Sequence, residues 1–253
     1  MNVSNIVYYL REYFFPNGCS GCGEALLTAE DAKYGLCRKC RAVFESTFAQ
    51  SERCAYCGKP LLSEKSSCLL CRKKGAVERE RYSDKIIKLR GLFPYSGKYK
   101  CVLAAYKFGK SLGAGNYLVG FFPRAIDGLN ILSVEPDFSA GLDCAWVPVP
   151  PRPGKIRKQG WDQIEFLAKQ LEAKHRQKIC RCLKRLPSRS QKELNRDERG
   201  INLKGRILCV KSPPRHAILF DDVITTGATL EACARALLDG GSEKVYGVCL
   251  FYD

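Results

Sequence analysis

The sequence lacks any long apolar run. Nothing in its 253 residues approaches the roughly 18 consecutive apolar residues that a membrane-spanning helix needs. The apolar stretch within residues 1–15 is interrupted by Arg11 and Glu12, and no small-residue cleavage site follows it. We therefore expect a cytoplasmic protein without membrane insertion, and an N-terminal helix over 1–15 that packs on the domain behind it.

Histidine and acidic residues are also scarce. The chain has 2 histidines, and its 26 acidic residues face 42 basic ones, which leaves a formal net charge of +16. Such an excess attracts polyanions or phosphorylated ligands. A composition with 45% hydrophobic residues excludes a disordered tail protein and allows one or two cores.

Cysteine, by contrast, is abundant. Without an export signal we expect a reducing compartment, where cysteines bind metal more often than they form disulfides. Eight of the 15 cysteines form four CxxC pairs, a spacing that aims two thiolates at one ion. The predicted ligands are Cys19, Cys22, Cys37, Cys40, Cys54, Cys57, Cys68 and Cys71.

These pairs predict two structural zinc sites. Sequential pairing, in which the first pair joins the second and the third joins the fourth, is the simplest arrangement. A cross-braced arrangement, in which the first pair joins the third and the second joins the fourth, is chemically just as possible. Either way four thiolates close each site, while His175 and His216 lie far downstream, which argues against catalytic zinc. Gly23 and Gly58 suit the positive φ of a zinc knuckle. We expect zinc to replace a hydrophobic core in this module.

The chain divides into a double zinc-binding module over residues 1–75, including the N-terminal helix, and an α/β domain over residues 76–253. From about residue 82, strand-like and helix-like segments alternate, which predicts a mostly parallel sheet flanked by helices. Residues 217–220 read as a buried strand that ends at Asp221 and Asp222. An amphipathic helix follows and ends at Asp239, Gly240 and Gly241.

The loop between this strand and helix predicts a phosphate site. Backbone N–H groups at a helix N-terminus, threonine hydroxyls and a glycine suit a phosphate, and such junctions bind ligands in open α/β sheets. The predicted cradle comprises Thr225, Thr226, Gly227, Ala228 and Thr229. The two aspartates before it repel phosphate, but they can accept hydrogen bonds from two vicinal hydroxyls or hold a divalent metal through water. This combination describes a ribose 5-phosphate.

The segment ILFDDVITTGAT, residues 218–229, resembles the phosphoribosyl pyrophosphate signature of type I phosphoribosyltransferases. The resemblance implies that fold, a mostly parallel twisted sheet flanked by helices, preceded here by the small zinc-binding module. It also implies that Asp221 and Asp222 are catalytic residues facing the ribose hydroxyls, and that Mg²⁺ accompanies the pyrophosphate.

Together the two domains resemble the ComF family of competence proteins over essentially the whole chain. The family's LKF segment is matched by residues 105–108, its PVP segment by 147–150, and its Q..L....R..N spacing by Gln191, Leu194, Arg199 and Asn202. Where the family usually has Arg-Gly-Phe-Asn-Gln, this chain has Gln-Gly-Trp-Asp-Gln over 159–163. The neutral amide of Gln159 cannot replace the charged guanidinium of arginine, which can donate two hydrogen bonds to pyrophosphate. Arg157 or Lys158 would then have to supply the missing positive charge.

Most of the positive charge lies in residues 152–215, with 19 basic and 6 acidic residues, 19 − 6 = +13. We expect cations at the pyrophosphate side of the pocket, namely Lys107, Arg152, Arg157 and Lys158. The remainder suits a nucleic-acid backbone. Trp161 is a candidate for stacking a base or for packing in the core. The candidate nucleic-acid residues are Lys155, Trp161, Lys184, Arg185, Arg189, Lys192, Arg196 and Arg199.

Three functions remain open. In the first, the protein binds phosphoribosyl pyrophosphate and single-stranded DNA during DNA uptake in natural transformation, with a competence helicase or recombination loader as a further partner. In the second, it is an active phosphoribosyltransferase, a glycosyltransferase of the purine, pyrimidine or amido type. In the third, it is a zinc-module adaptor that senses the metabolite.

Overall fold

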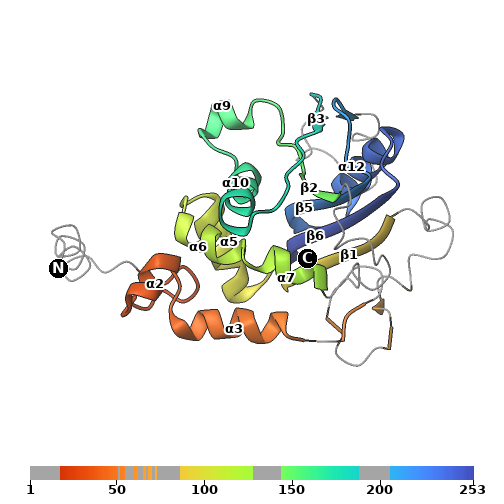
Figure 1. Cartoon of the computed structure of the whole chain (residues 1–253). Coiled ribbons are helices and arrows are strands. Elements are labelled where there is room, and N and C mark those ends of the chain that lie inside the picture. The colour runs from red at the N-terminus through yellow and green to blue at the C-terminus, as the bar shows by residue number, and fades with distance from the viewer. Residues whose placement is uncertain are drawn as a thin grey trace.

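A computed structural model gives the fold over most of the chain (Figure 1). It describes residues 18–50, 52–54, 60–61, 65–66, 68–69, 72, 86–127, 144–187 and 206–253. The predicted N-terminal helix lies outside these residues, as do Cys57, Gly58, Cys71 and four of the candidate nucleic-acid residues, Arg189, Lys192, Arg196 and Arg199. The helices that are described all fall short of the length and apolarity that crossing a membrane requires.

A four-stranded sheet forms the centre of the fold, with all neighbouring strands parallel. Its order is β1-β6-β5-β2. The strands are β1 (Ile86–Pro94), β2 (Cys144–Pro148), β5 (His216–Ile224) and β6 (Lys244–Tyr252). The middle strands β5 and β6 are apolar on both faces because helices or a hairpin cover each side. The predicted mixed α/β architecture is confirmed.

Two cores lie on opposite faces of this sheet. On one face, a group of helices packs against Ile218, Phe220 and Tyr246. These helices are α5 (Gly97–Lys107), α6 (Leu112–Leu118), α7 (Phe121–Asp127) and α10 (Gln163–His175). On the other face, a helix and a hairpin pack against Leu219 and Val245. They are α12 (Ala228–Asp239) and the antiparallel strands β3 (Leu183–Arg185) and β4 (Ile207–Cys209).

The predicted strand before the threonine loop is longer than expected. Instead of ending at the two aspartates, β5 continues to Ile224, because β6 runs beside it and pairs as far as Ile224 with Tyr252. The aspartates are therefore held by the sheet ladder. The helix prediction after the loop is confirmed, since α12 ends at Asp239 and Gly240 caps it.

The N-terminal helices α2 (Ala29–Tyr34) and α3 (Arg38–Phe48) lie against the α/β part of the molecule (Figure 1). Phe44 of α3 is 1% exposed and has ring centroids 4.7 Å from Phe93 and 4.8 Å from Tyr99. Cys19, Cys37, Cys40 and Phe44 thus belong to the same core as the sheet. The expectation that zinc replaces a core here was incomplete, because part of the module shares the core of the α/β part.

Candidate functional site

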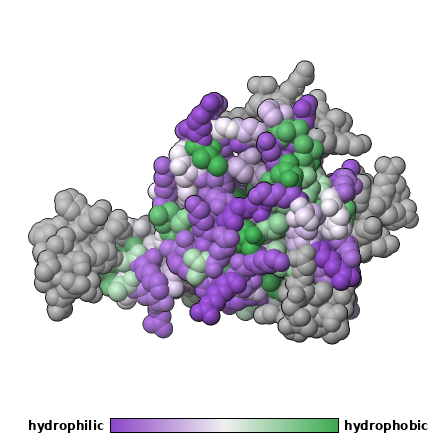
Figure 2. All heavy atoms as spheres, turned by 45° about the horizontal axis from the view of Figure 1, so that its top comes forward, coloured by the Kyte–Doolittle hydropathy of each residue, from purple (hydrophilic) through white to green (hydrophobic). Residues whose placement is uncertain are grey.

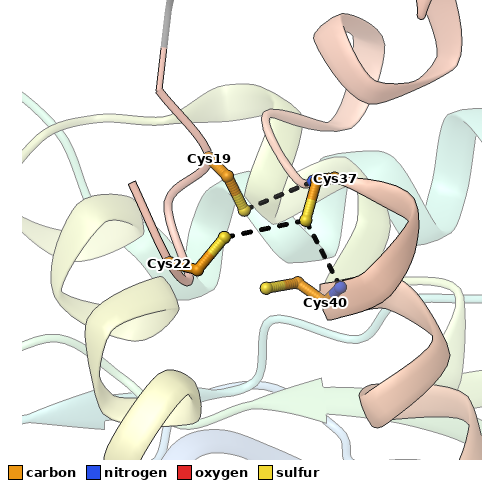
Figure 3. Close-up of side chains that lie close together, drawn as sticks. All are labelled: Cys19, Cys22, Cys37 and Cys40. Atoms are coloured by element: carbon orange, nitrogen blue, oxygen red, sulfur yellow. Dashed lines mark hydrogen bonds between the residues drawn. The ribbon is translucent and has the colours of Figure 1, made fainter. Parts of the chain in front are cut away.

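The first four cysteines form one compact cluster. The sulfur atoms of Cys19, Cys22, Cys37 and Cys40 all lie within 4.8 Å of one another, and in Figure 3 they point toward a common centre. The Cys22 and Cys37 sulfurs are 3.7 Å apart. Four sulfurs placed tetrahedrally at a Zn–S distance of about 2.3 Å would be separated by about 3.8 Å. The donor set and its spacing therefore fit a structural Zn²⁺.

Local backbone geometry builds this cluster. Gly23 follows the first pair with φ +77°, as the knuckle prediction requires, and Cys37 is the N-cap of α3. Backbone N–H groups of Cys37 and Gly21 donate to Cys19 Sγ at 3.3 and 3.4 Å. Burial alone would raise the pKa of the Cys19 thiol, but these donors outweigh it and lower the pKa to about 7. At Cys19, the thiolate that a metal requires is thus favoured.

The cluster brings together the first and second CxxC pairs, as sequential pairing predicts for this site. Of the second predicted site, the structure describes Cys54 and Cys68, one from each remaining pair. Both are buried, and the Cys68 N–H donates to Cys54 Sγ at 3.3 Å. This contact joins the third pair to the fourth, in keeping with the same arrangement.

A second candidate site is a cavity of about 660 Å³ near the C-terminal ends of β2 and β5. That volume falls within the usual range for small-molecule sites. Figure 2, which brings the top of Figure 1 forward, shows mainly hydrophilic residues on this side of the molecule. The charged lining residues are Lys107, Arg152, Lys155, Lys158, Asp162, Arg185, Asp221 and Asp222. The five cations outnumber the three carboxyl groups, which suits an anionic ligand.

The two aspartates enter this cavity from opposite faces of the sheet. Asp222 faces the helical layer, where Lys107 Nζ lies 2.9 Å from its Oδ2 and Gln163 donates to the same oxygen at 2.6 Å. Asp221 lies opposite Cys249 in the ladder, on the α12 side. Burial and the neighbouring Asp222 raise the pKa of Asp221 to about 8. One aspartate thus has a cationic partner while the other favours its protonated form near neutral pH.

The threonine loop borders the same cavity. Gly227 is the N-cap of α12 and has φ +84°, a left-handed conformation that favours glycine. No side chain caps the helix at this residue, although the Ala228 N–H donates to Thr226 Oγ1 at 3.3 Å. Thr225 and Thr229 line the cavity directly. The N-terminal end of α12, with its partial positive charge, therefore lies beside Asp221 and Asp222.

The opposite wall comes from the segment after β2. Here α9 (Lys155–Gln159) carries Lys155, whose Nζ lies 2.6 Å from Asp162 Oδ2 and also contacts Gln163 Oε1. Arg152 and Lys158 line the cavity, as expected for cations on the pyrophosphate side. Arg157 is exposed on α9 and is not among the lining residues.

Arg185 belongs to the cavity wall rather than to the exposed surface where the nucleic-acid prediction placed it. The residue is 9% exposed, and its Nε and one terminal nitrogen have no hydrogen-bond partner among the described residues. Burial and nearby Arg152 lower the pKa of this guanidinium. The sequence signal that would have found this is the alternation of side chains along β3. Lys184 points to solvent, so the next residue, Arg185, must point to the opposite face of the strand.

Two other described nucleic-acid candidates, Lys184 and Trp161, differ in their exposure to solvent. Lys184 is exposed. Trp161 is half-buried, with its ring centroid 5.4 Å from that of Tyr106 in an edge-to-face contact, so it packs on the helical layer. Gln163 and Phe108, which also line the cavity, were not singled out as site residues. Gln163 could have been found as the end of the 159–163 segment.

Two comparisons with known proteins bear on this pair of sites. Residues 10–73 match the double zinc ribbon domain family. The chain is also 27% identical over 212 residues to the competence protein ComFC of Streptococcus pneumoniae (strain ATCC BAA-255 / R6), an alignment that covers 83% of this chain and 84% of the relative. The resemblance to the ComF family is confirmed. A structural zinc site in the N-terminal ribbon is supported both by the match to the double zinc ribbon family and by the geometry of the four cysteines.

One residue of the departure from the usual ComF segment, Asp162, has a structural account. Asp162, which stands where the family usually has asparagine, is the N-cap of α10 and accepts from the Ile164 and Glu165 N–H groups at 3.0 and 2.9 Å. Asparagine caps helices equally well, so the cap survives either residue. What aspartate adds is the ion pair with Lys155. This ComF-like chain therefore ties one of its cavity cations to an extra negative charge.

Proposed function

We propose that the chain binds phosphoribosyl pyrophosphate in the cavity and single-stranded DNA on its basic surface, and acts in DNA uptake. The competence-related role is supported by the similarity to ComFC. In this proposal the 5-phosphate meets the threonine loop and the N-terminus of α12, while Asp221 and Asp222 accept hydrogen bonds from the ribose hydroxyls. We place this activity in the cytoplasm.

One observation carries the proposal for the small ligand. A single cavity joins an open helix N-terminus, two carboxyl groups and an excess of cations. A sugar phosphate with a second anionic group needs all three features. Arg185 strengthens this inference. Two nitrogens of its buried guanidinium have no hydrogen-bond partner among the described residues, which is costly, and an anionic ligand would remove that cost. Lys107, Arg152 and Lys158 add charge on the same side.

Magnesium fits the same donor set. Carboxylate oxygens are the ligands that Mg²⁺ prefers, and Asp221 and Asp222 would hold the ion through water. When bound, the ion would neutralise part of the pyrophosphate charge. The residues of this chain would then orient the sugar, hold the phosphate and keep the leaving group close to Arg185 and Arg152.

The DNA part of the proposal rests on the charge of residues 152–215 together with the ComFC likeness. Lys184 and Arg157 are exposed, and Lys158 lines the cavity. Each phosphate neutralised by such a residue releases a counterion, so the affinity should fall steeply with salt. A competence helicase or recombination loader remains a proposed partner.

Calorimetric titration with phosphoribosyl pyrophosphate and Mg²⁺, with and without an oligonucleotide, tests both parts. We expect binding of each ligand and loss of the small ligand in the variant Asp221→Ala, Asp222→Ala, with circular dichroism showing that the variant is folded. Wild-type affinity in this variant would refute the site. Oligonucleotide binding that is absent at low salt, or unchanged at high salt, would refute the electrostatic DNA site.

An active transferase is the second candidate function, and Arg185 favours it. In that reaction a nitrogen nucleophile attacks ribose C1, the bond from C1 to the pyrophosphate oxygen breaks, and pyrophosphate leaves with the bonding electrons. A buried guanidinium near the leaving group would stabilise its charge. Release of pyrophosphate with any member of a panel of bases or amines would establish turnover. If no member of the panel releases pyrophosphate, the protein binds the ligand without turning it over.

A further inference from the structure

We propose that Phe108 is a stacking platform for an unpaired base of single-stranded DNA at the mouth of the cavity. This inference rests on the proposed function and adds the place and the residue at which a base of the strand would be held. The ring lies directly after α5, next to Lys107, and lines the cavity. It was not among the residues that the sequence suggested for nucleic acid.

The exposure of Phe108 sets it apart from other aromatic residues. Its side chain is 78% exposed, whereas the other aromatic residues whose burial the structure describes are buried or half-buried. Phe108 also has no ring contact with another aromatic residue in that part of the chain. Trp161, the aromatic residue suggested by sequence, uses its ring to pack on Tyr106 and Phe166. Among the aromatic residues whose burial the structure describes, Phe108 is therefore the one with a ring face available to a ligand.

The turn that carries Phe108 is held in one shape. A Cβ at Gly109 would meet the Ala105 carbonyl oxygen at 2.8 Å, so the close approach of this turn to α5 requires glycine. Lys110 follows with φ +51°, an uncommon conformation for a residue with a side chain. The Ser111 N–H donates to the Ala105 carbonyl at 3.1 Å and closes the turn. A fixed turn at a cavity mouth keeps the exposed ring in place rather than leaving it on a loose loop.

The surroundings of the ring indicate which ligand it would meet. Isolated exposed apolar residues are normal on protein surfaces, but this one shares a cavity wall with Lys107, Lys155 and Lys158. Single strands are bound by this combination of aromatic faces for bases and cations for the backbone. The exposed Lys110 adds charge two residues away. A neutral aromatic ligand would make no use of these cations.

Fluorescence anisotropy with labelled oligo(dT) and with an abasic oligomer of equal length tests the proposal. We expect Phe108→Ala to weaken oligo(dT) binding about 5- to 150-fold, the range expected for one stacked base. Binding of the abasic backbone should be unchanged. Phe108→Trp should retain affinity, and oligo(dT) should quench the fluorescence that the new indole adds. Leu27→Ala, at an apolar residue that is 87% exposed outside the cavity, is the matched control.

Each other outcome is decisive. If Phe108→Ala binds oligo(dT) as the wild type does, or loses abasic binding equally, the stacking role is wrong while the proposed function stands. Full affinity in Phe108→Leu would likewise reduce the ring to an apolar contact. If the wild type binds neither oligomer at low salt, the DNA part of the proposed function fails and this inference fails with it.

Discussion

Lys107 Nζ lies 2.9 Å from Asp222 Oδ2, and this ion pair joins the end of α5 to a carboxylate near the C-terminal end of β5. The two side chains are 23% and 7% exposed, so little water screens the pair. Gln163 donates to the same oxygen, which leaves Asp222 with two partners before any ligand arrives. This contact offsets a negative charge that would otherwise repel a phosphorylated ligand.

We expect Lys107→Met to weaken binding of phosphoribosyl pyrophosphate at least tenfold. The substitution removes a cavity cation and also exposes the ligand to an uncompensated Asp222, and a tenfold loss corresponds to about 1.4 kcal/mol. Isothermal titration calorimetry measures the change. Lys98→Met, at an exposed position on the same helix outside the cavity, should bind normally. Equal affinities in both variants would contradict a role for Lys107 in the site.

Asp162→Asn should lower stability and raise ligand affinity at once. The amide keeps the cap of α10, so the loss should be about 1 kcal/mol, from the ion pair with Lys155. Removing one negative charge from the cavity should tighten phosphoribosyl pyrophosphate binding several-fold. Asp162→Ala, which also loses the cap, should cost about 1 kcal/mol more. Urea denaturation and calorimetry measure the two effects, and weaker binding by Asp162→Asn would count against the assignment of this wall.

Asp221→Asn should be more stable than the wild type at alkaline pH in buffer without Mg²⁺ or ligand. Between the ordinary pKa of 3.8 and the raised pKa of about 8, the folded state holds a proton on Asp221 that the unfolded state has lost. Wild-type stability therefore falls as the pH rises through this window, and the amide removes that dependence. At about 1.4 kcal/mol per pKa unit, the difference in unfolding free energy between the two proteins should approach on the order of 6 kcal/mol near pH 9. Parallel pH profiles of the two proteins would disprove the raised pKa.

Removing zinc should destabilise the α/β part as well as the ribbon. Cys40, a predicted ligand, and Phe44 share one core with the sheet, so a strong zinc chelator should lower the melting temperature of the whole chain. Phe44→Ala should cost about 3–5 kcal/mol. Cys40→Ser should lose zinc, measured by metal analysis, whereas Cys101→Ser at an exposed site should not. A separate low-temperature transition that leaves the rest unchanged would show two independent units.

The sequence predicted those parts of the fold whose signals are local. Four CxxC pairs, an apolar strand and a helix with a glycine cap are patterns within short windows, and the first cysteine cluster and α12 agree with them. The end of β5 was misplaced because β6, which follows α12 in the chain, extends β5 by pairing with it. Arg185 was assigned by charge alone, although the alternation along β3 indicated that it is buried. For Trp161 the sequence left stacking and packing open, and its contact with Tyr106 favours packing. Contacts between distant segments leave no mark in a local pattern.

Asp221 and Asp222 are neighbours in the chain, yet their side chains lie on opposite faces of the sheet. One belongs with α12 and the β3–β4 hairpin, and the other with α5 and α10. A sugar that bridges the two carboxyl groups would connect these two layers at the C-terminal end of β5. Such a sugar would contact both layers of the fold at once, because the cavity is lined by residues from each of them.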